Sequence, residues 1–259
     1  MPALDRRLRR DRAVVGAALL AIALVAWLYL VHLSATMPGM DMADMPGMAM
    51  PRAHAWDPLD VGLLFIMWAV MMIAMMVPAA APMVLTFAMV QRQRQEQDRA
   101  TVPTVVFLLG YALVWTAYAA VAALVQGRLH EADLLSATMA STSTRLGGAL
   151  LLIAGVFQWT PLKQACLAKC RSPLSFVMSE WREGRAGAFV MGVRHGAYCV
   201  ACCWALMALL FVAGVMNLLW IAGLAILVLV ERVLPGGPAV SRIVGVLFLL
   251  TGVVVLVRG

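Results

Sequence analysis

The stretch "LLFIMWAVMMIAMMVPAAAPMVL", residues 63–85, runs for 23 residues without a charge. An apolar run of about 20 residues is long enough to cross the hydrocarbon layer of a bilayer as an α-helix. Similar runs recur along the chain, and together they predict seven helical spans. These are 13–33, 60–88, 103–125, 146–162, 187–214, 217–233 and 240–257. The sequence therefore predicts an all-α, polytopic membrane helical bundle.

The composition agrees with a membrane protein. Hydrophobic residues make up 63% of the 259 residues and charged residues 13%, whereas soluble domains average about 45–50% and 25%. The net charge of +7 would suggest nucleic acid in a soluble protein. With a cytoplasmic N-terminus, however, fifteen Lys and Arg residues fall on the inner side and four on the outer side, which follows the positive-inside rule. We therefore expect a bacterial inner-membrane protein whose partner is lipid and not nucleic acid.

The first predicted span follows five arginines between residues 6 and 12. A secretory signal peptide has a similar basic start, but its apolar region is only about 7–15 residues long. We expect a retained anchor, and a cleaved signal that leaves six helices is the alternative. The expected organisation is a basic cytoplasmic N-terminus with its anchor (1–36), an external Met-rich loop (37–58) and a six-helix metal-binding membrane domain (59–259).

The external loop contains "MPGMDMADMPGMAM" at residues 37–50. Its six methionines are Met37, Met40, Met42, Met45, Met48 and Met50. Thioether sulfur is a soft ligand that selects Cu(I), and it forms no disulfide in an oxidising compartment. Proline and glycine between the methionines favour a loop. We interpret the stretch as a copper-capture segment, and a low-complexity linker is the alternative.

The second span carries methionines at helical spacing. Met71 and Met75 share one stripe, and Met72 and Met76 share a neighbouring one. Two prolines, at 78 and 82, are expected to interrupt the helix and to free backbone carbonyls that need other partners. Broken helices of this kind often mark binding sites in transporters. Packing between helices is an equally compatible role for these methionines.

Cysteines occur in two clusters, both predicted to lie inside or at the inner side of the membrane. In "MGVRHGAYCVACCWALM" (191–207), the residues His195, Cys199, Cys202 and Cys203 share one helix face. In "LKQACLAKC" (162–170), Cys166 and Cys170 are four residues apart, beside Lys163 and Lys169, which would favour thiolate. We expect these faces to bind metal. Zinc is less expected than copper, because the spacing is not that of a zinc ribbon. The alternative is that these cysteines are small hydrophobic residues packed in the interior, without a metal.

Several charged and polar residues lie near these clusters. Arg194 is an intramembrane charge expected to reach the interface, to pair with Glu180 or Glu183, or to bias the cysteines toward thiolate. Glu231 and Arg232, at the inner end of the sixth span, are expected to form an ordinary interface pair. Met71 and Cys199 fall at similar depths by helical rise, so their two faces would meet if the second and fifth spans are neighbours.

Four stretches carry a resemblance to a known family. They are "MWAVMMIAMMVPAAAPM" (67–83), "QWTPLKQACLAKCRSPL" (158–174), "MGVRHGAYCVACCWALMALLFVAGVMNLLW" (191–220) and "ERVLP" (231–235). Over about residues 60–255 the chain resembles a bacterial family of predicted metal-binding integral membrane proteins of unassigned function, often labelled copper chaperones. The resemblance implies a set of metal-site positions, and the Met-rich loop lies outside its pattern. These positions are Met71, Met72, Met75, Met76, Cys166, Cys170, His195, Cys199, Cys202 and Cys203.

Three functions fit these observations. The first is a Cu(I)-binding membrane protein that captures copper outside through Met and holds it at the Cys/His/Met site, for transfer or for delivery to a periplasmic or membrane cuproprotein. The second is a thiol-redox protein that uses the C-x2-C spacing of Cys199 and Cys202. The third is a scaffold subunit without metal. We expect no enzyme, because the sequence contains no hydrolytic motif and no phosphate-binding loop.

Overall fold

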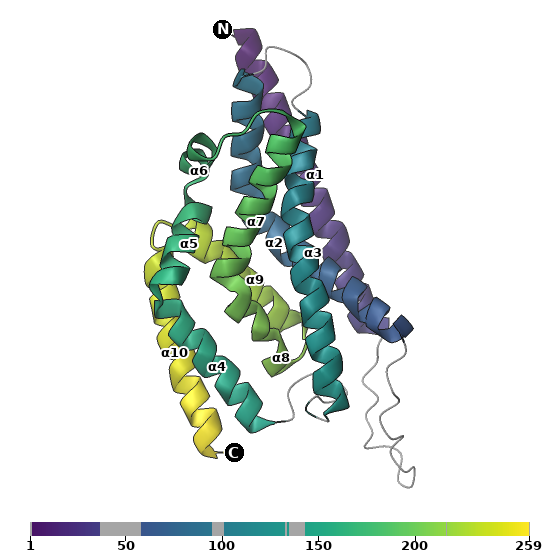
Figure 1. Ribbon diagram of the computed structural model, residues 1–259, viewed down its shortest axis with the longest axis vertical. Helices are drawn as coiled ribbons and strands as arrows, with labels where there is room; N and C mark the ends of the chain where they lie inside the picture. The colour runs from purple at the N-terminus through teal and green to yellow at the C-terminus, as the bar shows by residue number, and fades with distance from the viewer. Residues whose placement is uncertain are drawn as a thin grey trace.

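The computed structural model describes residues 2–36, 58–94, 101–132, 134, 143–215 and 217–258, and the regular structure in these ranges is helical. The predicted helical bundle is confirmed. Figure 1 shows α1, α2, α3 and α7 on one side, with α4 and α10 along the other. The helices are α1 (Pro2–Thr36), α2 (Pro58–Arg94), α3 (Thr101–Glu131), α4 (Thr144–Trp159), α5 (Pro161–Arg171), α6 (Pro173–Ser179), α7 (Gly184–Ala208), α8 (Leu210–Ala213), α9 (Leu218–Val233) and α10 (Gly237–Arg258).

Five segments are long and apolar enough to cross a membrane. They are Arg12–Ala35, Val61–Arg94, Val102–Glu131, Gly184–Ala213 and Gly237–Arg258. The pair α4 and α5 becomes a sixth span if its 66° bend lies within the membrane. The predicted span 217–233 corresponds to α9, which has 16 residues and is about 24 Å long at 1.5 Å per residue. This helix is shorter than the roughly 30 Å of hydrocarbon, so by length the described residues give five or six spans and not seven.

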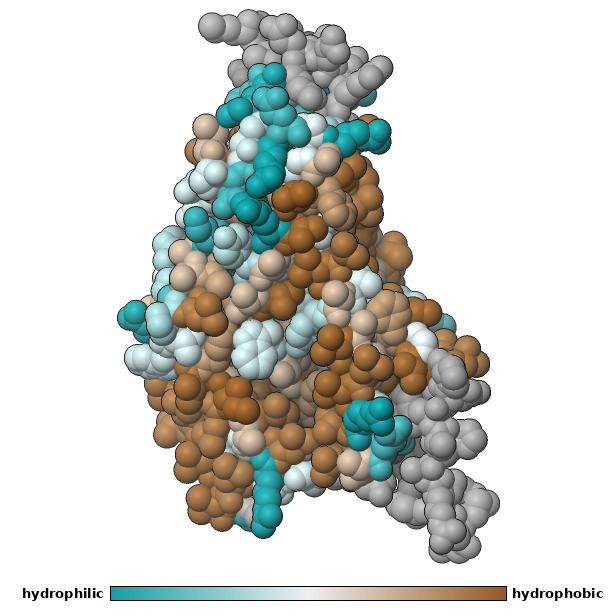
Figure 2. Space-filling model, viewed as in Figure 1, coloured by the Kyte–Doolittle hydropathy of each residue, from teal (hydrophilic) through white to brown (hydrophobic). Residues whose placement is uncertain are grey.

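The surface is divided between apolar and hydrophilic regions. Figure 2 shows apolar side chains over most of the middle and lower part of one face, while hydrophilic side chains gather toward the end where α1 begins. The outward faces of α1, α3 and α10 carry large exposed apolar side chains, such as Leu28, Leu124 and Leu250. Apolar surface of this extent fits contact with lipid.

The second helix passes through both of its prolines. It runs without interruption over Pro58–Arg94, so the expected break at Pro78 and Pro82 does not occur. Pro78 lacks the N–H that would normally bond the carbonyl of Ala74, and the indole Nε1 of Trp27 donates to that oxygen at 3.2 Å. A side chain of α1 therefore replaces the missing helical donor and ties α1 to α2.

Glycines allow α3 and α7 to approach closely. A Cβ at Gly192 would collide with the carbonyl oxygen of Phe107, and one at Gly196 would lie 2.9 Å from the Val114 Cβ. Small residues at a helix crossing let the two backbones come together. This close packing brings the aromatic side chains of α3 against the buried face of α7.

The chain bends sharply between α4 and α5. Thr160 has an extended backbone, its side chain accepts a hydrogen bond from the N–H of Lys163, and Pro161 occupies the first helical position of α5. A capping hydroxyl followed by proline is a typical helix start. The bend turns α5 toward α7 and places the α5 cysteines beside the α7 cysteines.

Candidate metal site

The cysteines of α7 form a buried thiol cluster, defined here as Cys199, Cys202 and Cys203. Each side chain is at most 1% exposed, and the sulfur atoms of Cys202 and Cys203 lie 3.3 Å apart. The Cys202 thiol also donates to the carbonyl of Cys199 at 3.2 Å. The helical spacing in the sequence correctly predicted that these three residues share one inward face.

The α5 cysteines extend this cluster. Cys166 and Cys170 are 8% and 7% exposed, the Cys170 side chain interacts with Cys202, and Cys166 lies within electrostatic range of Cys203. None of the five cysteines forms a disulfide, and all five lie in described parts of the chain. Five soft sulfur atoms from two helices therefore meet in one interior region.

Two aromatic residues of α3 contact the cluster from the opposite side. The Tyr111 hydroxyl lies 3.0 Å from the Cys199 sulfur, and the Trp115 indole N–H donates to the same sulfur at 3.2 Å. The Tyr111 hydroxyl also donates to the carbonyl of Met76 at 3.2 Å. Tyr111 therefore links the Met-bearing helix α2 to the thiol cluster.

The residue that sequence reasoning missed is Arg232. Its Nη2 donates to all three cluster sulfurs, at 2.8 Å to Cys199, 3.2 Å to Cys203 and 3.5 Å to Cys202. The side chain is only 5% exposed. The interpretation of Glu231 and Arg232 as an ordinary interface pair is therefore wrong. Adjacent residues on a helix point about 100° apart, and here they enter two different buried groups.

Glu231 belongs to a buried polar cluster beside the thiols. Lys163 donates to its Oε2 at 2.8 Å, and Gln158 donates to its Oε1 at 2.9 Å. Lys163 also donates to Gln158, whose side-chain oxygen accepts a hydrogen bond from Ser241 at 2.9 Å. Each of these four side chains is at most 1% exposed. Lys163 therefore neutralises Glu231 and is not an exposed basic residue, while Lys169, the other lysine predicted to favour thiolate, is exposed.

His195 lies one helical turn before Cys199 and is enclosed by aromatic rings. Its ring stacks on Tyr111 at 5.4 Å between centroids, and Phe176 meets it edge-on at 5.4 Å. The side chain is 1% exposed, and neither ring nitrogen has a hydrogen-bond partner within the described residues. A buried imidazole without a partner is costly, so the nitrogens are available to a ligand. Arg194, next to it, faces outward and pairs with Glu180, as expected.

The methionines of α2 are fully buried. Met71, Met72, Met75 and Met76 are each at most 1% exposed. Helix α2 packs mainly against α1 and α3, whereas α7 packs mainly against α3 and α5. The second and fifth predicted spans are thus not principal neighbours, and α3 joins them. Met75 faces a pocket of about 350 Å³ that it shares with Trp27 of α1 and Leu229 of α9.

The remaining predicted ligands cannot be placed. Met37, Met40, Met42, Met45, Met48 and Met50 all lie outside the described residues. Within the ranges that are described, no three His, Cys, Asp or Glu side chains are arranged to hold a metal ion directly. The Arg232 guanidinium sits against all three cluster sulfurs, so an ion bound by them requires it to move aside. The metal-ligand role of the predicted residues stays a prediction.

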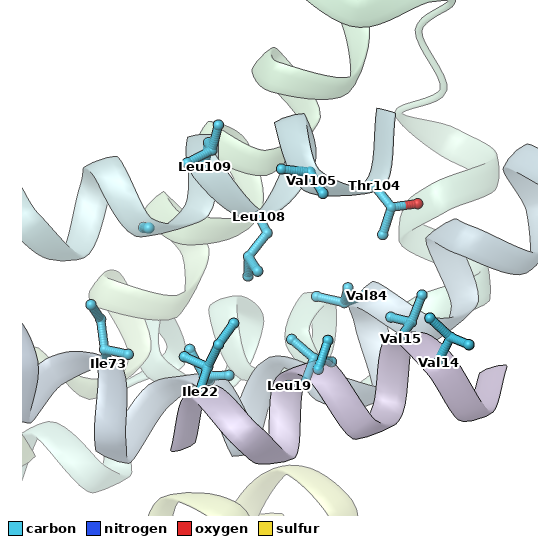
Figure 3. A pocket seen from close by; sticks show the side chains of 13 residues that line it. Val14, Val15, Leu19, Ile22, Ile73, Val84, Thr104, Val105, Leu108 and Leu109 are labelled. Atoms are coloured by element: carbon cyan, nitrogen blue, oxygen red, sulfur yellow. The ribbon is translucent and has the colours of Figure 1, made fainter. Parts of the chain in front are cut away.

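A separate cavity of about 390 Å³ lies between α1, α2 and α3 (Figure 3). Its walls are aliphatic, with Leu19 and Ile22 of α1 facing Leu108 of α3, and Thr104 supplies the one hydroxyl. Among the described residues, no Cys, His or Met side chain lines it. This cavity therefore has none of the chemistry of a soft-metal site, which the thiol cluster supplies instead.

A comparison with protein families gives a match over most of the chain. The model of a family described as copper chaperone (PpoB2) matches residues 65–255, which include the thiol cluster, both α5 cysteines, Arg232 and the α2 methionines. The matched region begins after the Met-rich loop. No curated protein and no solved structure matches the chain.

Proposed function

Because the chain belongs to this copper chaperone family, we propose that it is a membrane protein that binds Cu(I) at the thiol cluster of α7 and passes it on. Copper is its cargo. The observation that carries the proposal is the convergence of five buried cysteines from α5 and α7. Thiolate sulfur is the ligand that selects Cu(I), Zn and iron–sulfur clusters over hard cations.

The donor set favours copper over the other soft metals. The same bundle also buries the methionines of α2 and the imidazole of His195, which has no hydrogen-bond partner among the described residues. Uncharged thioethers suit Cu(I), whereas structural zinc sites are built from four Cys and His ligands. The cluster is at most 1% exposed, so it is shielded from water and from exchange with hard oxygen ligands.

We further propose that copper enters from the external side through the methionines of residues 37–50. These thioethers would capture Cu(I), the α2 methionines would accept it, and the thiol cluster would hold it for a periplasmic or membrane cuproprotein. Tyr111 supports this route, because its hydroxyl contacts both the Met76 carbonyl and the Cys199 sulfur. The setting would be the bacterial inner membrane, with the N-terminus cytoplasmic.

The test is the metal content of protein purified anaerobically in detergent. Cys199→Ser combined with Cys203→Ser is expected to lower bound copper to less than half of the wild-type content, because two of the three cluster sulfurs are lost. Ala201→Ser is the matched control, since it places a hydroxyl on the same helix without removing a thiol. Copper content that is equal in the double variant and the control would refute the site.

One contact favours a second candidate function. Cys170 of α5 lies within interaction range of Cys202 of α7, and a pair that exchanges between dithiol and disulfide must lie close together. A thiol-redox protein would show a Cys170–Cys202 disulfide in membranes and no copper. Alkylation of free thiols before mass spectrometry distinguishes the two functions, because the copper proposal expects both thiols to be alkylated after copper is removed.

A further inference from the structure

The charges buried around the thiol cluster do not cancel. Lys163 and Glu231 form one pair at 2.8 Å. Arg232 is the third buried charge, and within the described residues no carboxylate pairs with it. Its Nη2 donates to the three sulfurs, while its Nε and Nη1 have no hydrogen-bond partner among the described residues. The three buried charges, Lys163, Glu231 and Arg232, therefore sum to one positive charge in excess.

An unbalanced guanidinium is costly in a low-dielectric interior, because removal from water is repaid only by an opposite charge. The groups placed to supply that charge are the cluster thiols. When two of them bind Cu(I), two protons leave to solvent, and the complex of one Cu(I) with two thiolates carries one negative charge. That charge equals the excess around Arg232.

We propose that Arg232 is the counter-cation of the copper site: it contacts the sulfurs in the empty protein and neutralises the anionic Cu(I)–dithiolate complex when cargo is bound. This inference rests on the proposed function. It assigns Arg232 a role through charge and not as a ligand, since a guanidinium has no lone pair to offer a metal. The guanidinium moves aside on loading but stays within the buried region.

The experiment measures Cu(I) affinity of the purified full-length protein by competition with a chromophoric Cu(I) chelator. Arg232→Gln keeps a polar side chain without the charge, and it should weaken Cu(I) binding by about tenfold or more. Arg232→Lys keeps the charge and should stay within about threefold of wild type. Arg185→Gln removes a charge from the exposed start of α7 and is the matched control.

A charge-compensation variant separates this role from a structural one. Glu231→Gln frees the charge of Lys163, which lies within electrostatic range of Cys203. Adding Glu231→Gln to Arg232→Gln restores one excess positive charge, so the double variant should recover most of the lost affinity. A purely structural arginine predicts that the double variant binds more weakly still.

The outcomes are distinct. Loss in Arg232→Gln with recovery in Arg232→Lys and in the double variant supports the inference. Wild-type affinity in Arg232→Gln, or a loss of about tenfold in Arg232→Lys, overturns it, and the lysine variant decides alone if the glutamine variant does not fold. Failure of the wild-type protein to bind Cu(I) through its cysteines instead overturns the proposed function itself.

Discussion

Breaking the buried pair of Lys163 and Glu231 should destabilise the protein strongly. Lys163→Met leaves Glu231 buried with the Gln158 amide, at 2.9 Å, as its remaining donor. Removing one partner of a fully buried ion pair costs about 3–5 kcal/mol. For a chain of 150–250 residues, about 1 kcal/mol shifts the midpoint of thermal unfolding by about 2–4 °C, so the expected decrease is about 6–20 °C. Tryptophan fluorescence during heating in detergent measures it.

A double-mutant cycle with Glu231→Gln isolates the pair. The double variant should lose less than the sum of the two single losses, because neither buried charge then stands alone. The exposed pair of Arg128 and Glu131, at 3.2 Å with 84% and 51% of the side chains exposed, is the control. Arg128→Met should change stability by less than about 1 kcal/mol. A midpoint for Lys163→Met equal to that of Arg128→Met would show that the buried pair contributes nothing.

Three further predictions concern helix packing and cargo entry. Gly192→Ala should push α3 away from α7, and should therefore lower the free energy of unfolding by about 1–3 kcal/mol and reduce the amount of bound copper. Gly223→Ala is the control: a Cβ there meets open space, so neither the stability nor the copper content should change. Trp27→Phe should lower the free energy of unfolding by about 1–3 kcal/mol, because the Ala74 carbonyl loses its donor. Adding Pro78→Ala should restore the stability, because the introduced alanine supplies the helical N–H to that carbonyl. A double variant that unfolds at the same temperature as Trp27→Phe would refute this pairing. Replacing the methionines of 37–50 by leucine should slow copper accumulation by cells while leaving copper bound by Cu(I)-saturated purified protein unchanged; equal accumulation argues against capture.

The helices could be predicted well because the lipid interior offers no hydrogen-bond partners to the backbone. Each backbone group must be paired within its own segment, so every long apolar run becomes a helix. The same rule explains the error at Pro78. A break was expected there because the carbonyl of Ala74 loses its donor, but a tryptophan from another helix supplies one. The local sequence shows that the Ala74 carbonyl needs another donor, but it does not show which residue supplies it.

The thiol cluster was predictable in part. Spacing of four residues correctly placed Cys199 and Cys203 on one face, since this follows from helix geometry alone. Arg232 was not found, because its position at the end of an apolar run resembles that of an interface residue. The signal that was available is the pair of polar residues at 158 and 231 within otherwise apolar segments, since polar groups inside a membrane are retained where they have partners.

Helix α9 ends early, and its last turn lies beside the thiol cluster. α9 stops at Val233 after 16 residues, and its last carbonyls lack intrahelical partners. Arg171, directly after Cys170, donates to the carbonyls of Glu231 at 2.8 Å and Pro235 at 2.9 Å. A helix end in an apolar setting requires such polar partners, and Arg171 supplies them beside the last turn of α9. The same last turn of α9 carries Arg232 to the thiols, where its charge would neutralise the anionic copper–thiolate complex that we propose.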